Sequence, residues 1–161
     1  MTSPTSISDS IQTLLHTTGF AVLATENAGQ PHTSLIAITP LDQGQRLLFA
    51  TYRNTRKFTN LMQNQRVSLL LDGRYRDGSN GAFAGFILSA IGRVQEIDAA
   101  AHSQLLSVHL QRHPDLATFL QAANCVLLVV VVEAYQVVRG IDDVTWISTE
   151  ELKPLHSPDP H

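Results

Sequence analysis

The sequence predicts a mainly β fold, a small closed or split β-barrel of six or seven antiparallel strands with peripheral helices. Short apolar runs alternate with Gly-containing turns, which favours hairpin-joined strands over βαβ units. Helical periodicity is confined to a few short stretches between these runs. At 161 residues, with 43% hydrophobic and 16% charged residues, the chain has the balance of a single globular domain with its own core.

The expected strands are apolar runs that end at turn-forming residues. They cover 20–25, 31–39, 46–50, 66–72, 83–97, 126–138 and 144–147. The fifth run is expected to bend at Gly85 or Gly92. The sixth is the most β-branched part of the chain, which favours a central strand. Segment 73–81 holds three glycines and no aliphatic residue, so we expect a loop.

Helices are expected near the N-terminus and after the third strand. The first is expected to be short, capped by Ser8 and ended by Gly19. The second is expected to begin at Asn54 or Thr55 and to end near residues 63–64.

Two further helices are expected before the central strand. Asp98 is expected to cap one that runs to about Arg112, and Pro114 opens a short second one. We expect an N-terminal arm with a short helix, one barrel domain and a polar C-terminal tail, at 1–18, 19–148 and 149–161.

The composition narrows the class of protein. Eleven basic and 14 acidic residues give a net charge of −3, which argues against a nucleic-acid-binding protein. The single cysteine, Cys125, cannot form an internal disulfide. The first residues have no basic and apolar leader pattern, and no apolar run approaches the ~20 residues of a membrane helix. We therefore expect a cytoplasmic domain that contacts neither membrane nor nucleic acid.

The small net charge hides a basic segment. Seven of the 11 basic residues lie between positions 46 and 76, where Asp72 is the only acidic residue. Within this segment, Thr55, Arg56 and Lys57 begin the second expected helix. Free backbone N–H groups and the helix dipole attract anions at a helix N-terminus, and cations there disfavour the helix unless an anion compensates. The segment therefore predicts a phosphate site; a cationic turn that only faces water is the alternative.

Other reactive residues give weaker signals. His102, His109 and His113 could share one helix face as a metal site, but no Cys or carboxylate completes it, which favours surface histidines. His32 is either a neighbour of the bound ligand or an exposed strand residue. Cys125 opens an apolar strand with no cation nearby, which indicates an inert core thiol. The chain has no Gly-x-Gly-x-x-Gly or Walker loop, and no acid–base dyad or nucleophile triad is evident.

Four segments in order resemble the pyridoxamine 5′-phosphate oxidase-like, FMN-binding split-barrel family. These are Gly-Phe-Ala-Val-Leu-Ala-Thr at 19–25, Gly-Gln-Pro-His-Thr-Ser at 29–34, the stretch 48–57 that ends in Thr-Arg-Lys, and Asn-Gln-Arg-Val-Ser-Leu-Leu-Leu at 64–71. The resemblance is good over residues 19–94 and looser beyond. It implies a homodimer of six- to seven-stranded antiparallel split β-barrels with FMN in a groove at the subunit interface.

The resemblance also implies cofactor-binding residues. Arg56 and Lys57 match the pair that holds the FMN phosphate, with Thr55 beside them, and Trp146 matches an aromatic residue that covers the flavin from the partner subunit or is instead a half-buried core residue. Positions 34–39 match the strand along the isoalloxazine ring, and 50–51 match the end of the third strand. The implied set is Ser34, Leu35, Ile36, Ala50, Thr51, Thr55, Arg56, Lys57 and Trp146.

The sequence departs from pyridoxamine phosphate oxidases at substrate positions. Ser34 and Thr39 replace an Arg and a Lys of those enzymes, and apolar Ile87 lies where they direct a glutamine at the flavin. Residues 151–154 only faintly match their C-terminal Arg-Leu-x-Pro motif. These differences argue against vitamin B6 oxidation and leave FMN binding intact.

The sequence thus predicts an FMN-dependent oxidoreductase that acts on an unidentified small molecule. The flavin would carry the electron chemistry and the protein would supply position and hydrogen bonds, so no catalytic side chain is assigned. The alternatives are a non-catalytic flavin- or haem-binding protein, and a reductase that uses the deazaflavin F420.

Overall fold

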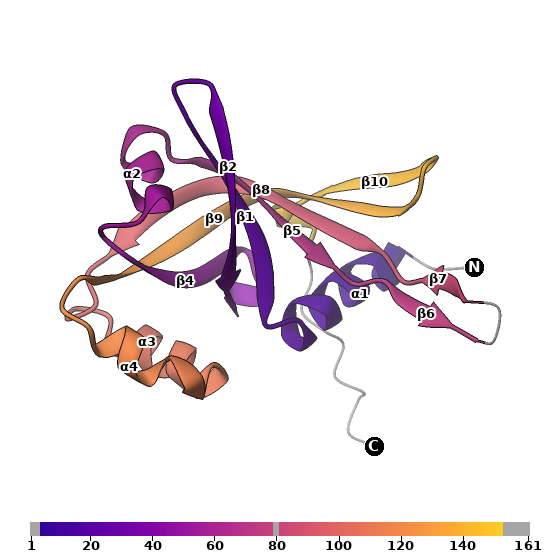
Figure 1. The fold of residues 1–161 in the computed structure, drawn as a ribbon. Helices are drawn as coiled ribbons and strands as arrows, with labels where there is room; N and C mark the ends of the chain where they lie inside the picture. Colours follow the sequence, from indigo (N-terminus) through magenta and orange to yellow (C-terminus); the bar gives the residue numbers. More distant parts are fainter. Residues whose placement is uncertain (1–3, 79–80, 153–161) are drawn as a thin grey trace, which may run out of the picture.

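The computed structural model describes residues 4–78 and 81–152. Eight strands form one antiparallel sheet in the order β2-β1-β5-β8-β9-β4-β3, with β10 paired to β9 (Figure 1). The strands of this sheet are β1 (Phe20–Asn27), β2 (Gln30–Ala37), β3 (Thr39–Leu41), β4 (Arg46–Tyr52), β5 (Arg66–Asp72), β8 (Ile87–Ile97), β9 (Cys125–Gly140) and β10 (Asp143–Ser148). The sheet curls without closing, and β2 and β4 come into contact across the gap. The expected split barrel with peripheral helices is confirmed.

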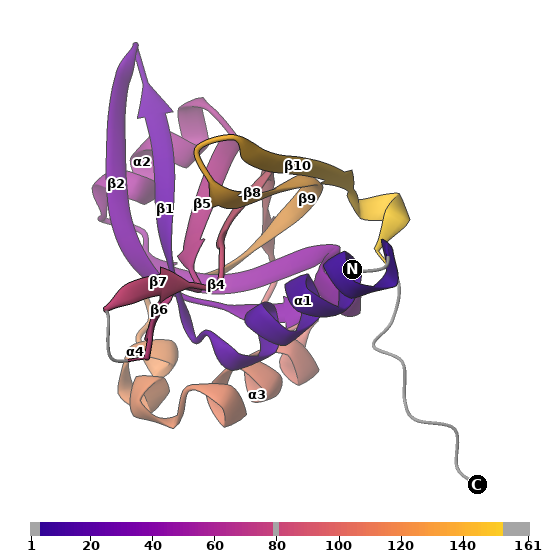
Figure 2. The same ribbon diagram turned by 90° about the vertical axis from the view of Figure 1, so that its right-hand side faces the viewer.

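Helices cover the ends and one side of the barrel (Figure 2). They are α1 (Pro4–Thr17), α2 (Arg56–Gln63), α3 (Ser103–Arg112) and α4 (Ala117–Gln121), with short 3-10 helices at η1 (Asp42–Gly44), η2 (Pro114–Leu116) and η3 (Thr149–Glu151). In the described part of the chain, no helix is both long enough and apolar enough to span a membrane.

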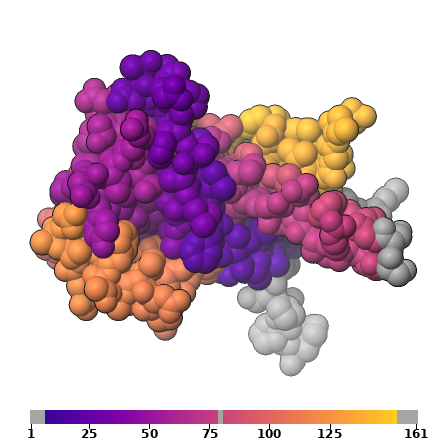
Figure 3. Space-filling view, viewed as in Figure 1, coloured from indigo at the N-terminus to yellow at the C-terminus, as the bar shows by residue number. Residues whose placement is uncertain are grey.

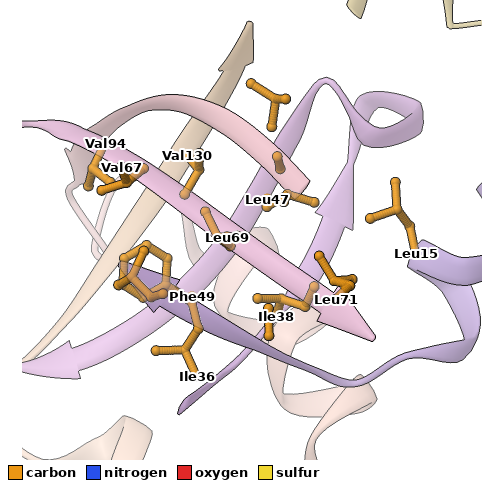
Figure 4. Close-up of a cluster of buried hydrophobic side chains, with 14 of the residues drawn as sticks. Leu15, Ile36, Ile38, Leu47, Phe49, Val67, Leu69, Leu71, Val94 and Val130 are labelled. Atoms are coloured by element: carbon orange, nitrogen blue, oxygen red, sulfur yellow. The ribbon is translucent and has the colours of Figure 1, made fainter. Parts of the chain in front are cut away.

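The first half of β9 is buried on both faces. Its side chains alternate between two apolar clusters, as the period of two in a strand requires. Val126, Leu128 and Val130 face the barrel interior, part of which is drawn in Figure 4 with Leu15 of α1 pointing toward the strands. Leu127 and Val129 face outward, where α3 and α4 cover them. The β-branched sequence therefore predicted the central strand correctly.

The strands differ from expectation in their number and in the positions at which they are interrupted. Ten strands are present in the described residues, because segment 73–81 is not a plain loop: β6 (Tyr75–Asp77) pairs with β7 (Ala82–Ala84). Sequence reasoning missed this hairpin because its stabilising contacts are not aliphatic; the guanidinium groups of Arg74 and Arg76 lie over the Phe83 ring, 5.1 and 4.7 Å from its centroid.

The expected strand 83–97 is interrupted at Gly85, and its pairing is irregular at Gly92, the two glycines offered as alternative bend positions. Gly85 separates β7 from β8 at a φ of +85°, and a Cβ there would lie 2.3 Å from the Gly73 oxygen. A register shift follows Ile91, and a Cβ on Gly92 would lie 2.2 Å from the Val131 oxygen. The expected strand 31–39 is likewise split, because the Ile38 N–H donates to Gly19 O before β3 joins β4.

Two helix starts were predicted wrongly. Helix α1 begins at Pro4, so Ser8 is a buried residue within the helix and does not cap it. Helix α3 begins at Ser103, because Asp98 closes a turn in which its side chain accepts from the Ala100 N–H at 3.0 Å and its carbonyl accepts from the His102 N–H. Thr55 does cap α2, as one of the two predicted positions.

The prediction of surface histidines holds for His102 but is wrong for His109 and His113. The latter two are buried and join α3 to the segment around β3. The His109 Nδ1 atom lies 2.8 Å from Thr39 Oγ1, and His113 Nε2 donates to the Ile38 oxygen at 2.7 Å. Burial, followed by the nearby His113 and Arg112, lowers the pKa of His109 to about 4. His109 is therefore neutral at pH 7.

Burial of neutral His109 predicts acid destabilisation. In the unfolded chain this imidazole takes up a proton near pH 6.5, but in the folded chain only near pH 4. Its contribution is therefore complete above pH 6.5 and is lost as the pH falls toward 4. Lowering the pH from 7 to 4.5 should reduce the free energy of unfolding by about 2 kcal/mol through this group. Urea titrations at the two pH values measure the difference.

The variant His109→Gln should remove this part of the pH dependence, whereas His102→Gln, on the exposed start of the same helix, should retain it. An equal loss of stability in wild type and His109→Gln would contradict the assignment.

Candidate functional site

A cavity of about 300 Å³ opens where β2, the end of β4, the start of α2 and the α3–α4 segment meet. Six of the nine residues implied by the family resemblance line it: Leu35, Ile36, Ala50, Thr51, Thr55 and Lys57. They come from three elements separated in sequence, so the curl of the sheet is what brings them together.

The start of α2 is fixed by a network of hydroxyl groups. Thr55 Oγ1 accepts from the Phe58 N–H at 3.3 Å and donates to the Tyr52 oxygen at 2.9 Å. The Thr51 and Thr55 hydroxyl oxygens are 3.0 Å apart, which ties the end of β4 to the first turn of the helix. This arrangement holds the N-terminus of α2 at the cavity wall, where the backbone N–H groups of the first turn have no acceptor within the helix.

The first turn of α2 carries uncompensated positive charge. Arg53 pairs with Glu96 at 2.7 Å, but within the described ranges neither Arg56 nor Lys57 forms an ion pair, and the first turn has no acidic residue. Burial lowers the pKa of Lys57, because removal from water disfavours its charged form. A bound anion would offset both the burial of the ammonium group and its unfavourable place at the positive end of the helix dipole.

Arg56 and Lys57 lie on different sides of the helix start. Consecutive residues of an α-helix do not face each other, and Arg56 lines a neighbouring cavity of about 440 Å³ together with His32 and Asn60. His32 is half-buried, and its Nδ1 atom has no hydrogen-bond partner among the described residues. The two cations thus flank the N-terminus of α2, and Lys57 is the one that lines the cavity of about 300 Å³ beside β2 and β4.

Ser34 and Trp146 do not line the cavity of about 300 Å³. Ser34 lies on β2 next to Leu35, and its buried hydroxyl has no partner in the part of the chain that the structure describes. Trp146 lies on β10 at the end of the molecule away from α2 (Figure 1), and 54% of its surface is exposed. Trp146 is therefore not a core residue within one chain.

The cavity has a wall that sequence reasoning missed. His109 of α3, Leu116 of η2 and Phe119 of α4 line it opposite the predicted residues. The signal was present, because Leu105, Leu106, His109, Leu110 and His113 follow the spacing of a buried helical stripe. The interpretation as surface histidines rested on residue type and overlooked this position on the stripe.

An exposed apolar face adjoins the cavity. One row of directly paired residues crosses six strands of the sheet on its outer side: Leu35, Val22, Leu70, Ser89, Gln136 and Trp146. The four apolar members of this row are exposed, Leu35 by 69%. Leu35 and the exposed Phe20 also line the cavity, so the row begins at its mouth. The strands β6 and β7 and the end that carries β10 project from the body on the side away from α2 (Figure 3).

Metal binding and thiol chemistry have little support among the described residues. Within the described ranges, no three His, Cys, Asp or Glu side chains are placed to hold a metal ion. Cys125 is half-buried at the start of β9, and burial raises the pKa of its thiol, which makes it a poor nucleophile.

Solved structures share the fold at low sequence identity. A haem-binding protein from Mycobacterium smegmatis is 15% identical, with a TM-score of 0.77 over 94% of this chain and 60% of its own length. ChuZ from Campylobacter jejuni is 13% identical, with a TM-score of 0.76 over 94% of this chain and 63% of its own. This chain thus spans less than two thirds of either protein.

A third structure matches along nearly its whole length. It is a Clostridium acetobutylicum protein related to general stress protein 26 of Bacillus subtilis, described as of the pyridoxinephosphate oxidase family; it is 14% identical, with a TM-score of 0.71 over 92% of this chain and 99% of its own. A comparison with curated proteins found no significant match.

Sequence similarity to a family model is more decisive than these structural likenesses, which at such identities show the fold alone. The model described as pyridoxamine 5′-phosphate oxidase matches residues 7–138. This range includes α2, the ends of β2 and β4, and the α3–α4 wall of the cavity. The chain belongs to the pyridoxamine 5′-phosphate oxidase-like family of split β-barrels.

Proposed function

We propose that this protein binds FMN in the cavity lined by β2, β4 and the start of α2 and acts as a flavin-dependent oxidoreductase on a small molecule. The observation that carries the proposal is a cavity with two unlike parts. At one side lies the positively charged start of α2, at Thr55 and Lys57, and the part lined by β2 and β4 is uncharged. FMN has the matching division, with a phosphate at one end and a flat, uncharged ring system at the other.

The residues present fit this cofactor in two respects. Lys57, the Thr55 hydroxyl and the N–H groups of the first turn of α2 supply donors and charge for the phosphate, with Arg56 approaching from the neighbouring cavity. Leu35, Ile36 and Ala50 give the ring an apolar surface beside β2, an edge strand of the sheet. When bound, the flavin supplies the electron transfer, and the chain's own residues bind it, orient it and exclude water.

We also propose a homodimer formed through the exposed apolar face. A row of Leu35, Val22, Leu70 and Trp146 on the outer side of one sheet is unusual for a surface that stays in water. Because Leu35 and Phe20 belong both to this region and to the cavity wall, a second copy would close the mouth of the cavity. The exposure of Trp146, far from the cavity of its own chain, suits a residue that covers the cofactor of the partner.

The substrate positions support a reaction other than vitamin B6 oxidation. The Thr39 hydroxyl, at the position of the oxidases' Lys, is bound to His109 inside the protein. Ile87 pairs with Asp72 and Val138 in the sheet and offers no polar group. Glu151 and Leu152 lie at and just after η3, and Lys153 and Pro154 lie outside the described residues.

Haem binding is the second candidate. The structural similarity to a haem-binding protein from Mycobacterium smegmatis supports it, as does the fully buried His109 in the cavity wall, whose Nε2 has no partner in the described residues. A neutral imidazole nitrogen is a common axial ligand of haem iron. F420 is a third candidate, since its phosphate suits the same helix start.

Absorption spectra separate these candidates. The purified protein, dialysed after incubation with FMN, haem or F420 in turn, should retain FMN with a band near ~450 nm. Oxidation of NAD(P)H by the loaded protein then tests turnover. A Soret band with no retained flavin would mean that the protein binds haem and not FMN. A colourless protein after all three incubations would refute cofactor binding.

Removal of the two cations should weaken FMN binding through its phosphate. Each charge-assisted hydrogen bond contributes roughly 1.5–3 kcal/mol, so Arg56→Ala with Lys57→Ala should cost about 3 kcal/mol or more, a loss of roughly 100-fold in affinity. Of the single variants, Lys57→Ala should have the larger effect, because Lys57 lines the proposed FMN cavity and Arg56 lines the neighbouring one. Fluorescence titration with FMN measures the affinities.

Riboflavin, which lacks the phosphate, should bind wild type and double variant equally well. Arg66→Ala, at the exposed start of β5, is the matched charge control and should bind FMN as the wild type does. An FMN affinity unchanged in the double variant would refute the phosphate site.

A charge placed on the apolar face should separate the dimer. Leu70→Glu puts a carboxylate in the middle of the row, where burial without a partner is strongly unfavourable, so the dissociation constant should rise at least 100-fold. Val108→Glu, on the exposed side of α3, is the control and should stay dimeric. Analytical ultracentrifugation measures both, and a wild-type monomer would contradict the proposal.

A further inference from the structure

The α3–α4 wall of the cavity has no role in the proposed cofactor contacts. Its residues, His109, Leu116 and Phe119, face the cavity from the side opposite α2 and β2. We propose that this wall is the binding site of a second small molecule, which is uncharged, mainly apolar and held by a hydrogen bond from His109 to a carbonyl-type oxygen. The inference rests on the proposed function, of which it specifies the substrate class.

The first support is an unused polar atom. His109 is completely buried, and its Nε2 has no hydrogen-bond partner in the described part of the chain. A buried nitrogen without a partner costs about 1–3 kcal/mol, so native proteins rarely keep one without a reason. A ligand oxygen at the cavity wall would satisfy it.

The second support is the way His109 is held. Thr39 Oγ1 lies 2.8 Å from Nδ1, and the His113 ring packs at 5.0 Å between centroids while its own Nε2 donates to the Ile38 oxygen. These contacts fix the imidazole on two sides and leave only Nε2 available. The ring is therefore positioned before any ligand arrives.

The same contacts assign the proton. Thr39 is buried, and His109 is its only side-chain hydrogen-bond partner in the described residues. If the threonine hydroxyl donates to Nδ1, its hydrogen is satisfied and the imidazole proton lies on Nε2. In the opposite arrangement Nδ1 donates to the threonine oxygen. The hydroxyl hydrogen then has no acceptor, in addition to the Nε2 atom that has no partner in the described residues. The first arrangement is favoured, so Nε2 is a donor and its ligand partner is an acceptor.

The third support is the absence of charge at this wall. Lys57, on α2, is the charged residue that lines the cavity, and the other lining residues are apolar or neutral. Arg112, the nearest cation on α3, directs its guanidinium to the Leu15 and Thr18 oxygens at 2.9 and 3.1 Å. His109 itself is neutral at pH 7 because burial lowers its pKa. An anionic group at this wall would lose its hydration without a counter-charge, which selects an uncharged molecule.

Benzamide, benzoate and toluene test this inference as ligands of nearly the same shape. In FMN-loaded protein, benzamide should bind at least tenfold more tightly than either benzoate, which is charged, or toluene, which has no acceptor. The ¹H–¹⁵N signal of His109 Nε2 should move on addition of benzamide and stay in place on addition of toluene.

Variants then isolate the hydrogen bond. His109→Leu should weaken benzamide binding at least tenfold, leave toluene binding within about twofold, and leave FMN affinity within about threefold. Thr39→Val keeps the imidazole but removes the group that fixes it, and should weaken benzamide binding severalfold. His102→Leu, at the exposed start of α3, should change none of these affinities.

Three results would overturn the inference: benzoate binding more tightly than benzamide, benzamide binding unchanged in both His109→Leu and Thr39→Val, or FMN affinity falling as much as benzamide affinity. The last would mean that His109 contacts the cofactor. If the wild type does not bind FMN at all, the proposed function fails by itself. The His109 signal in flavin-free protein still decides whether the wall binds benzamide.

Discussion

The requirement that the first half of β9 bury both of its faces underlies the rest of this structure. β9 pairs with β4, β8 and β10, so it joins the two halves of the sheet to each other and to β10, which carries Trp146. Its inward residues complete the barrel core, and Leu127 and Val129 can leave water only if something covers them from outside. That covering is α3 and α4, which brings His109 to the cavity. The scaffold and the site are consequences of the same strand.

The candidate site combines rigidly held backbone N–H donors at the start of α2 with the positive charge of Lys57, which has no ion-pair partner in the described residues. Hydroxyl bonds among Thr51, Thr55 and Tyr52 fix the start of α2, so its free N–H groups and Lys57 are held at the cavity without a ligand. Holding a cation at this end of a helix disfavours the folded protein slightly, and partial burial adds to that. Such an arrangement favours binding of an anion, because the protein has already met the cost of ordering the site.

Local patterns predicted most of the fold and the Thr55-capped, cationic start of α2. Burial alternates along β1 and β5, and the first eight residues of β9 are all apolar, so their sequences carried the strand signal directly. Thr55 was recognisable because a cap needs a side-chain oxygen just before the helix. The β6–β7 hairpin was missed because arginine–aromatic contacts hold it. The burial of His109 was missed because the interpretation rested on residue type and overlooked its place on the apolar stripe of α3. Arg56 and Lys57 line different cavities because consecutive residues point in different directions around the helix axis. Residue composition does not reveal this difference.

The pairing of Ile97 with Leu127 has a consequence for how this fold can diversify. The whole α3–α4 segment enters and leaves the sheet at neighbouring points, so it is the loop of one long hairpin. Loops whose ends are already adjacent can change length and sequence at small entropic cost. Such a segment could be exchanged during evolution while the cationic start of α2 stayed unchanged, provided that each replacement still covered Leu48, Leu127 and Val129. Cofactor retention and substrate choice would then be inherited separately.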